Sequence, residues 1–405
     1  MLTFKIAFRN IFRQKRRTYL TILTMFGGFT LAAISFGWSD GTYNYVINMF
    51  TRNNLGHIQV HGAGYLDRPT LHNTINNHEE IGEQLQILPH TLTWSPRLYS
   101  SGLVSVGDKT SGVRIVGIDP VRENNATRFN KKIVRGRAFS SGNAAEVILG
   151  IGLAKILKAE VGDEAVIVSQ GADGSIANDL YAIVGIAETG DDIVDRIMFY
   201  LPLQAAQELL VLEGRIHEMI VIVDDLDYVP RVTAGIRDML KETDLVAAPW
   251  QEFARSFYRA MKADQKGTWI MLAIIIVIVA VGVLNTVLMT VLERTREYGV
   301  LRAVGTRPGQ IFKLVLYEVA TMAVISTIIG AILSAIINYL LSFHGIPMPI
   351  DYSYGGVEFS RMYTEINARS LIIPGITVVA SAMLISVFPA VKAARIAPAK
   401  AMRTH

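Results

Sequence analysis

The chain contains no cysteine in 405 residues. Disulfide bonds, thiolate metal sites and a cysteine nucleophile are therefore excluded, and any redox compartment remains compatible. No G-x-x-x-x-G-K-[ST] string occurs, so we expect no nucleotide to bind to this chain. A nucleophile elbow, a zincin signature and the protein-kinase motif set are also missing, which argues against those enzyme classes.

Charge is nearly absent from four long apolar stretches, in which Lys313 and Glu318 are the ionised side chains. A helix of roughly 20 apolar residues crosses a hydrocarbon core of about 30 Å. The stretches predict four transmembrane helices, at residues 18–39, 267–292, 311–341 and 370–391. A signal peptide is the alternative for the first stretch, but its apolar region would be too long and no A-x-A-like cleavage site follows.

Basic residues gather in three segments outside these helices. Residues 1–17 hold six Lys or Arg and no acid, residues 293–313 hold five against two acids, and residues 392–405 hold four against none. The positive-inside rule places all three in the cytoplasm, so both termini lie there and residues 40–266 and 342–369 lie outside. The pI near 9.1 then reflects topology and contact with lipid headgroups, and we expect no nucleic acid as partner.

The long segment 40–266 reads as an extracytoplasmic α+β domain. Six short β-branched runs predict strands, at 57–61, 103–106, 113–118, 165–168, 181–186 and 219–223. Amphipathic patterns predict helices at 144–158, 202–212 and 230–241. A boundary between two lobes is possible near 119–140, and helical patterns at 40–53 and 250–266 predict stalks that continue the first two spans.

Several ionisable residues in this domain raise the question of an enzyme. His57 and His61 share one face of a predicted strand but stand roughly 13 Å apart, too far for one metal ion. Asp191, Asp192 and Asp195 fit a solvated loop after the strand at 181–186. We therefore expect neither a metal site nor catalysis in this chain.

The most specific string lies directly after the second span, at 293–310. It predicts a charged cytoplasmic helix of about ten residues that ends at Gly305, followed by a turn in which Pro308 fixes the backbone. A short charged helix at the membrane surface suits docking into a groove of a cytoplasmic partner. A positive-inside loop without any partner is the alternative reading of the same string.

The R-E-x-G-x-L-R-A-x-G core of this string, at 296–305, resembles the coupling segment of the MacB, FtsX and LolC/LolE permeases of ABC transporters. Three further regions resemble the same family in the same order. They are the amphipathic helix at 7–18, the outer-domain pieces Gly136-Arg137, 146–150, Gly162-Asp163 and 184–186, and the closing tail 389–403, where Met402 replaces the usual Leu.

This resemblance implies a four-span permease of the mechanotransmission type that forms a dimer with a second copy or a paralogue. It implies that a cytoplasmic ABC ATPase dimer, which binds ATP and Mg, docks on the coupling segment and drives motion in the outer domain. Membrane lipid and a periplasmic protein are further partners that it suggests. The residues expected to couple to the ATPase are Glu293, Arg296, Glu297, Gly299, Leu301, Arg302 and Gly305.

The substrate stays open at this point. Release or export of a lipoprotein or lipid-linked substrate is the leading expectation, since the ATPase is expected on a separate chain and the outer domain is large. A tripartite efflux or peptide exporter is the first alternative. The second is an FtsX-like transmembrane regulator of cell-wall hydrolases.

Overall fold

The computed structural model describes residues 2–13, 15–140, 145–354 and 357–398, and this part of the chain folds into two compact units. The helical unit takes its residues from 1–44, 260–349 and 361–405. The sheet unit takes its residues from 45–259 and 350–360.

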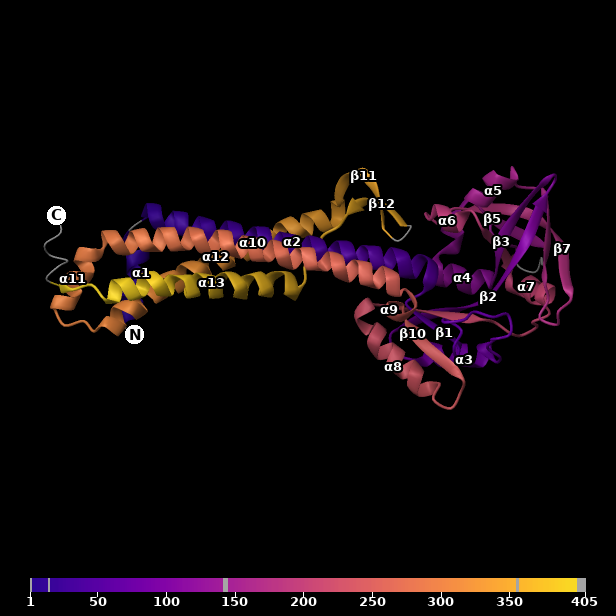
Figure 1. The fold of residues 1–405 in the computed structure, drawn as a ribbon, viewed down its shortest axis with the longest axis horizontal. Coiled ribbons are helices and arrows are strands. Elements are labelled where there is room, and N and C mark those ends of the chain that lie inside the picture. Colours follow the sequence, from indigo (N-terminus) through magenta and orange to yellow (C-terminus); the bar gives the residue numbers. More distant parts are fainter. Residues whose placement is uncertain (1, 14, 141–144, 355–356, 399–405) are drawn as a thin grey trace. The chain divides into compact units, whose positions relative to one another are not determined.

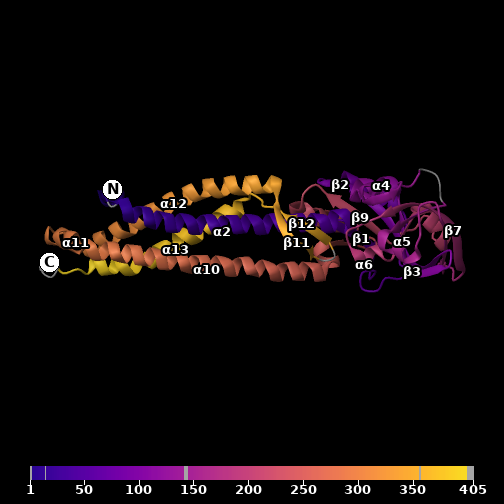
Figure 2. The ribbon, with the colours of Figure 1, turned by 90° about the horizontal axis from the view of Figure 1, so that it is seen from above.

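The helical unit contains six helices among the described residues. Four of them are long and apolar enough to cross a membrane: α2 (Lys15–Phe50), α10 (Arg255–Glu293), α12 (Pro308–His344) and α13 (Ala368–Ala394). Figures 1 and 2 show these four helices side by side, in both views. Two shorter helices, α1 (Leu2–Arg13) and α11 (Thr295–Ala303), belong to the same unit.

Small residues let the long helices approach closely. A Cβ on Gly28 of α2 would lie 2.2 Å from Cγ2 of Val279 on α10, and one on Gly330 of α12 would lie 2.5 Å from Cδ1 of Phe29. Both spacings are below any real contact, so only glycine fits at these crossings. On the opposite side of α10, Val277 and Val281 remain exposed, as expected for side chains that face lipid.

Among the described residues, the sheet unit is built on one sheet of ten strands, several of which are labelled in Figure 1. They are β1 (Ile58–Gly62), β2 (Thr91–Val106), β3 (Lys109–Ile118), β4 (Ile133–Gly136), β5 (Glu146–Gly150), β6 (Glu164–Gln170), β7 (Ile176–Ala187), β8 (Met198–Pro202), β9 (Glu218–Val223) and β10 (Leu245–Pro249). Their order is β10-β1-β9-β2-β3-β8-β5-β7-β4, and β6 pairs with both β7 and β2. The pairings from β2 through β3, β8, β5, β7 and β6 therefore return to β2.

Short helices cover this sheet. They are α3 (His78–Ile87), α4 (Pro120–Thr127), α5 (Ile151–Leu157), α6 (Asp192–Asp195), α7 (Leu203–Leu210), α8 (Val229–Met239) and α9 (Trp250–Phe253), with 3-10 turns at Phe129–Lys132 and Leu226–Tyr228. Helices α5 and α7 bury Leu153, Leu157 and Leu210 in one apolar core together with Ile115 and Phe199 of the strands. Burial of this apolar face is the main stabilising contribution to the unit.

Helix α2 runs without interruption from the apolar span as far as Phe50, where a π-helical turn at Thr51–Leu55 follows. Helix α10 begins at Arg255, after a break at Ala254. Within the sheet unit, the rings of Phe50 and Phe257 stack at 4.0 Å. Segment 342–369 contains a two-stranded sheet of β11 (Ile346–Tyr354) and β12 (Val357–Met362).

The α+β interpretation is confirmed. Five of the six predicted strands lie within observed ones, and the strand predicted at 57–61 overlaps β1 except for His57. The helix predicted at 144–158 is wrong in its first half, because 146–150 is the buried strand β5 between β7 and β8. The lobe boundary near 119–140 is also wrong, since α4 in this stretch is held to β2 by the Glu123–Arg97 ion pair at 2.6 Å. Asp195 does not lie in a solvated loop: its side chain is buried and accepts from Thr189 Oγ1 at 2.7 Å.

Candidate coupling site

Helix α11 follows α10 after a single residue, Arg294, and ends in a Schellman motif. Thr306 N donates to Leu301 O at 3.0 Å, and Gly305 N donates to Arg302 O at 3.1 Å. Gly305 has a φ of 101°, a conformation that costs glycine little and other residues more. The predicted end of the charged helix at Gly305 is therefore where the structure places it.

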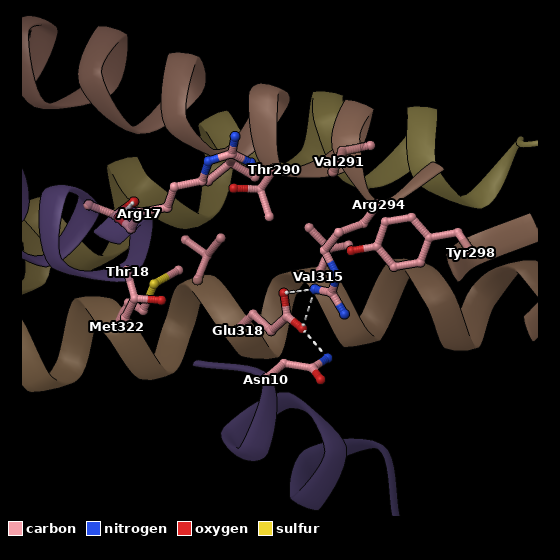
Figure 3. Close-up of a pocket in the computed structure, with 13 residues that line it drawn as sticks. Asn10, Arg17, Thr18, Thr290, Val291, Arg294, Tyr298, Val315, Glu318 and Met322 are labelled. Carbon is pink, nitrogen blue, oxygen red and sulfur yellow. Dashed lines mark hydrogen bonds and ion pairs between the residues drawn. The ribbon is translucent and has the colours of Figure 1, made fainter. Parts of the chain in front are cut away.

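Arg294 ties the start of α11 to the third span. Its Nη1 donates to both oxygens of Glu318 on α12, at 3.0 and 3.1 Å. Asn10 of α1 donates to the same carboxylate at 2.7 Å. Figure 3 shows Arg294 and Asn10 reaching Glu318 from separate elements, so three helical segments meet at one carboxylate.

This ion pair is buried, with side-chain exposures of 9% for Arg294 and 10% for Glu318. Burial alone would lower the pKa of Arg294, but the Glu318 carboxylate raises it above the ordinary value. The ring of Tyr298, which is fully buried, lies 5.1 Å from the Arg294 guanidinium. A buried, charged and multiply bonded pair holds its geometry strongly, because neither partner can be left alone without a large desolvation cost.

Both acids of the coupling segment form ion pairs within their own chain, and their side chains stay 42% (Glu293) and 41% (Glu297) exposed. Glu293 forms an ion pair with Arg17 of α2. Glu297 accepts from Arg294 Nε at 2.9 Å and lies 3.5 Å from Arg13 Nη2. These contacts join α11 to the N-terminal basic segment, which the sequence analysis had assigned to topology and contact with lipid headgroups.

The other side of α11 is open. Arg296 is exposed, and among the aliphatic side chains Val300 is 48%, Leu301 37% and Val304 83% exposed. Aliphatic carbon at this exposure, next to a cation, is typical of a surface that docks against another protein.

The seven predicted coupling residues therefore divide into three groups. Arg296 and Leu301 belong to the open side, while Glu293 and Glu297 form ion pairs within the chain. Gly299 is buried, Arg302 is half-buried, and Gly305 forms the cap.

The sequence reasoning missed Asn10, Arg13, Arg17, Arg294 and Tyr298 as members of this site. The lone acid Glu318 in an apolar run was the signal that a buried cation had to be near it.

The space inside this cluster is small. The cavity lined by Arg17, Glu318 and Tyr298 measures about 30 Å³, which suits one or two water molecules and excludes a nucleotide.

In the described part of the chain no three His, Asp or Glu side chains gather as metal ligands would. His57 accepts from Val223 N at 3.1 Å, and His61 lies 3.1 Å from Gln59 Oε1. The arrangement positions a helix.

Known proteins resemble the chain along its whole length. Residues 18–239 match the family model of the MacB-like periplasmic core domain, and residues 269–398 match that of the FtsX-like permease C-terminal region. The lipoprotein-releasing system transmembrane protein LolC of Neisseria meningitidis is 23% identical over 98% of each chain. A macrolide export ATP-binding/permease protein MacB of Campylobacter jejuni is 25% identical over 98% of this chain and 61% of its own length.

Among solved structures, the periplasmic region of MacB from Actinobacillus actinomycetemcomitans covers 50% of this chain and 92% of its own, at 15% identity and a TM-score of 0.37. The MacB-like match alone spans more than half of the sequence. The chain therefore belongs to the LolC/LolE/MacB family of ABC transporter permeases, with a MacB-like periplasmic core domain and an FtsX-like C-terminal region.

Proposed function

We propose that this permease couples ATP hydrolysis by a separate ATPase subunit to conformational work in its sheet unit, and that this work releases or exports a lipoprotein or lipid-linked substrate. The end-to-end similarity to LolC, over 98% of both chains, supports the substrate class.

The observation that carries the coupling role is the two-sided surface of α11. On one side, Glu297 of α11 pairs with Arg13 of α1, and the two residues before the helix, Glu293 and Arg294, pair with Arg17 of α2 and Glu318 of α12. The outward side of α11 offers Arg296 and Val304 to a partner. Force applied to the open side would pass into the spans through the buried Arg294–Glu318 pair and the partly exposed pairs of Glu297 and Glu293, whereas a freely hinged helix would absorb it.

ATP and Mg would be bound by the partner, because these 405 residues contain no P-loop sequence. The MacB relative is named as an ATP-binding/permease protein, and this chain covers 61% of it. We further propose an ATPase dimer and a second permease copy or paralogue in the complex. The coupling site and both termini would face the cytoplasm, and the sheet unit the periplasm.

Site-specific photo-crosslinking in whole cells tests the docking role. A photoreactive phenylalanine analogue at Val304 should capture a polypeptide that contains a P-loop, identified by mass spectrometry. The same analogue at Val246, an exposed residue of the sheet unit, is the matched control. Docking is refuted if Val304 captures no ATP-binding protein, or if Val246 captures the same one equally well.

A tripartite efflux or peptide exporter is the second candidate, supported by the MacB relative, which aligns with 98% of this chain. Depletion of the permease separates the two. Radiolabelled palmitate should mark lipoproteins that accumulate in the inner membrane if the chain releases lipoproteins. Greater macrolide sensitivity with normal lipoprotein sorting would favour efflux. Normal sorting and sensitivity with defective cell separation would favour the FtsX-like regulator.

A further inference from the structure

The sheet unit contains a second cavity, of about 330 Å³, that the coupling role does not use. This volume lies at the lower end of the range of small-molecule sites. One wall is a single face of the four adjacent strands β9, β2, β3 and β8. Three phenylalanines line the cavity from other elements: Phe50 at the end of α2, Phe129 in the turn after α4, and Phe253 of α9.

The strand register aligns two tyrosines on this wall. Val116 of β3 pairs with Tyr99 of β2 on one side and with Tyr200 of β8 on the other, so the three side chains share one face. The other face of the same strands carries Leu98 and Ile115 into the apolar core. The cavity therefore lies on the side of the sheet that the core helices α5 and α7 do not cover.

The charges around the cavity balance one another. Its lining holds three cations and three acids, which are Arg97, Arg114, Lys132, Glu123, Asp191 and Glu218. Arg97 donates to Glu123 at 2.6 and 3.1 Å and lies 3.7 Å from Glu218. Lys132 donates to Asn54 Oδ1 at 3.1 Å and is attracted by Glu123 and Asp195, while Arg114 is exposed to water. Because the buried charges already have partners, the cavity favours a neutral ligand.

Two tyrosine hydroxyls at this cavity have no hydrogen-bond partner among the described residues. Tyr65 is 7% and Tyr200 9% exposed, and both line the cavity. Ring contacts fix the two side chains. The ring of Tyr65 stacks on those of His61 and His217 at 5.5 and 5.6 Å, and the ring of Tyr200 meets that of Phe129 edge-on at 4.9 Å.

Both hydroxyls are able to donate. Burial raises the pKa of Tyr65 and that of Tyr200, so each phenol keeps its proton at neutral pH. Tyr99, the third tyrosine of the lining, differs because its Oη already donates to Glu218 at 3.1 Å. A buried hydroxyl without a partner costs free energy, and an acceptor oxygen in the cavity would remove this cost.

We propose that this cavity binds a small neutral aromatic molecule, with its ring among Phe50, Phe129 and Phe253 and its carbonyl oxygen bonded to the hydroxyls of Tyr65 and Tyr200. Aromatic walls with few convergent polar groups are typical of such sites. The binding is independent of the ATPase and goes beyond the proposed coupling role.

Fluorine NMR on the full chain in nanodiscs tests the proposal with three probes of one body. They are para-(trifluoromethyl)benzamide, which is neutral, and the corresponding benzoate and benzylamine, which are ionised. Addition of the protein should speed the transverse relaxation of the benzamide well beyond that of the other two, with empty nanodiscs as the blank. Benzamide relaxation no faster than in the blank, or a charged probe that relaxes as fast, would overturn the assignment.

Variants locate the site. Tyr65→Phe combined with Tyr200→Phe removes both hydroxyls and keeps both rings, so the fold should persist while benzamide binding weakens by about tenfold. Tyr228→Phe is the matched control and should change nothing, since the ring of Tyr228 stacks on His90 outside the cavity. Unchanged binding in the double variant would mean that the two hydroxyls hold water only and would reject the site. An equal loss in the control would reject it as well.

Discussion

Arg294 and Glu318, 24 residues apart, share two hydrogen bonds of 3.0 and 3.1 Å inside the helical unit. The pair joins the residue that separates α10 from α11 to the side of α12. A displacement of α11 must therefore move α12 or break a buried ion pair. This relationship gives the coupling segment a defined mechanical connection.

Removal of one partner should destabilise the helical unit strongly. Glu318→Ala leaves the Arg294 charge buried and should cost about 3–5 kcal/mol, measured by unfolding in detergent. The double variant Arg294→Met with Glu318→Met should recover much of the loss. Arg13→Ala, which breaks the exposed pair with Glu297, should cost less than about 1 kcal/mol. A similar cost for Glu318→Ala and Arg13→Ala would contradict the connection.

Changes on the open side of α11 should affect partner binding without affecting the fold. Val304→Asp and Arg296→Glu should each weaken association with the ATPase by about tenfold, because both side chains face outward. Val246→Asp provides the control in the sheet unit. The measurement is co-purification of the ATPase together with thermal unfolding. Weaker association that accompanies an equally lowered melting temperature would point to misfolding instead.

The C-terminal cap of α11 should require glycine at position 305 only because of the backbone conformation there. A Cβ at Gly305 would meet no atom within 4 Å, so Gly305→Ala should cost about 1 kcal/mol through its positive φ only. Gly309 is equally uncrowded but has no positive φ, so Gly309→Ala is a matched control that should be neutral. Hydrogen exchange at Thr306 should quicken in the first variant and stay unchanged in the second.

Acid should weaken the sheet unit through His57. Burial, with a smaller effect of Arg52, lowers the pKa of His57 to about 4 in the folded chain. The unfolded chain binds this proton below about pH 6.5, so the stabilisation is complete above that pH and is lost as the pH falls toward 4. The loss at pH 4 should reach about 3 kcal/mol. His57→Gln, which keeps an acceptor for Val223 N–H, should flatten this part of the pH profile of unfolding.

The orientation of the chain is a separate prediction. Gly174 lies in the turn between β6 and β7 with open space around it, so a reporter inserted there should be tolerated. It should report from outside the cytoplasm, and a reporter fused after His405 should report from inside. If both reporters signalled from the same compartment, the basic segments would not set the topology.

The spans and most strands could be predicted because their signals are local. An uncharged run or a short β-branched run carries its own period and hydrophobicity. Strand β5 was misread because Glu146–Gly150 is buried on both faces, between β7 and β8, and then leads directly into α5. A continuous apolar run of that kind does not show whether the residues follow the period of a helix or that of a strand.

The partners within the coupling site could not be predicted, because they are distant in sequence. Asn10 and Glu318 are 308 residues apart, and only the packed fold brings them together. The sequence gives the charges of Glu293 and Glu297 but not the direction that either side chain takes. The role of the seven coupling residues toward an ATPase stays a prediction.

The ion pairs that Glu293 and Glu297 form within the chain have a consequence for any protein that receives α11. Its receptor meets guanidinium groups and bare aliphatic carbon, since the acids are neutralised by Arg17, Arg13 and Arg294. A complementary groove must present carboxylates around an apolar surface. A high salt concentration would then slow the association of the two proteins by screening the carboxylates, and it would leave the apolar contact intact.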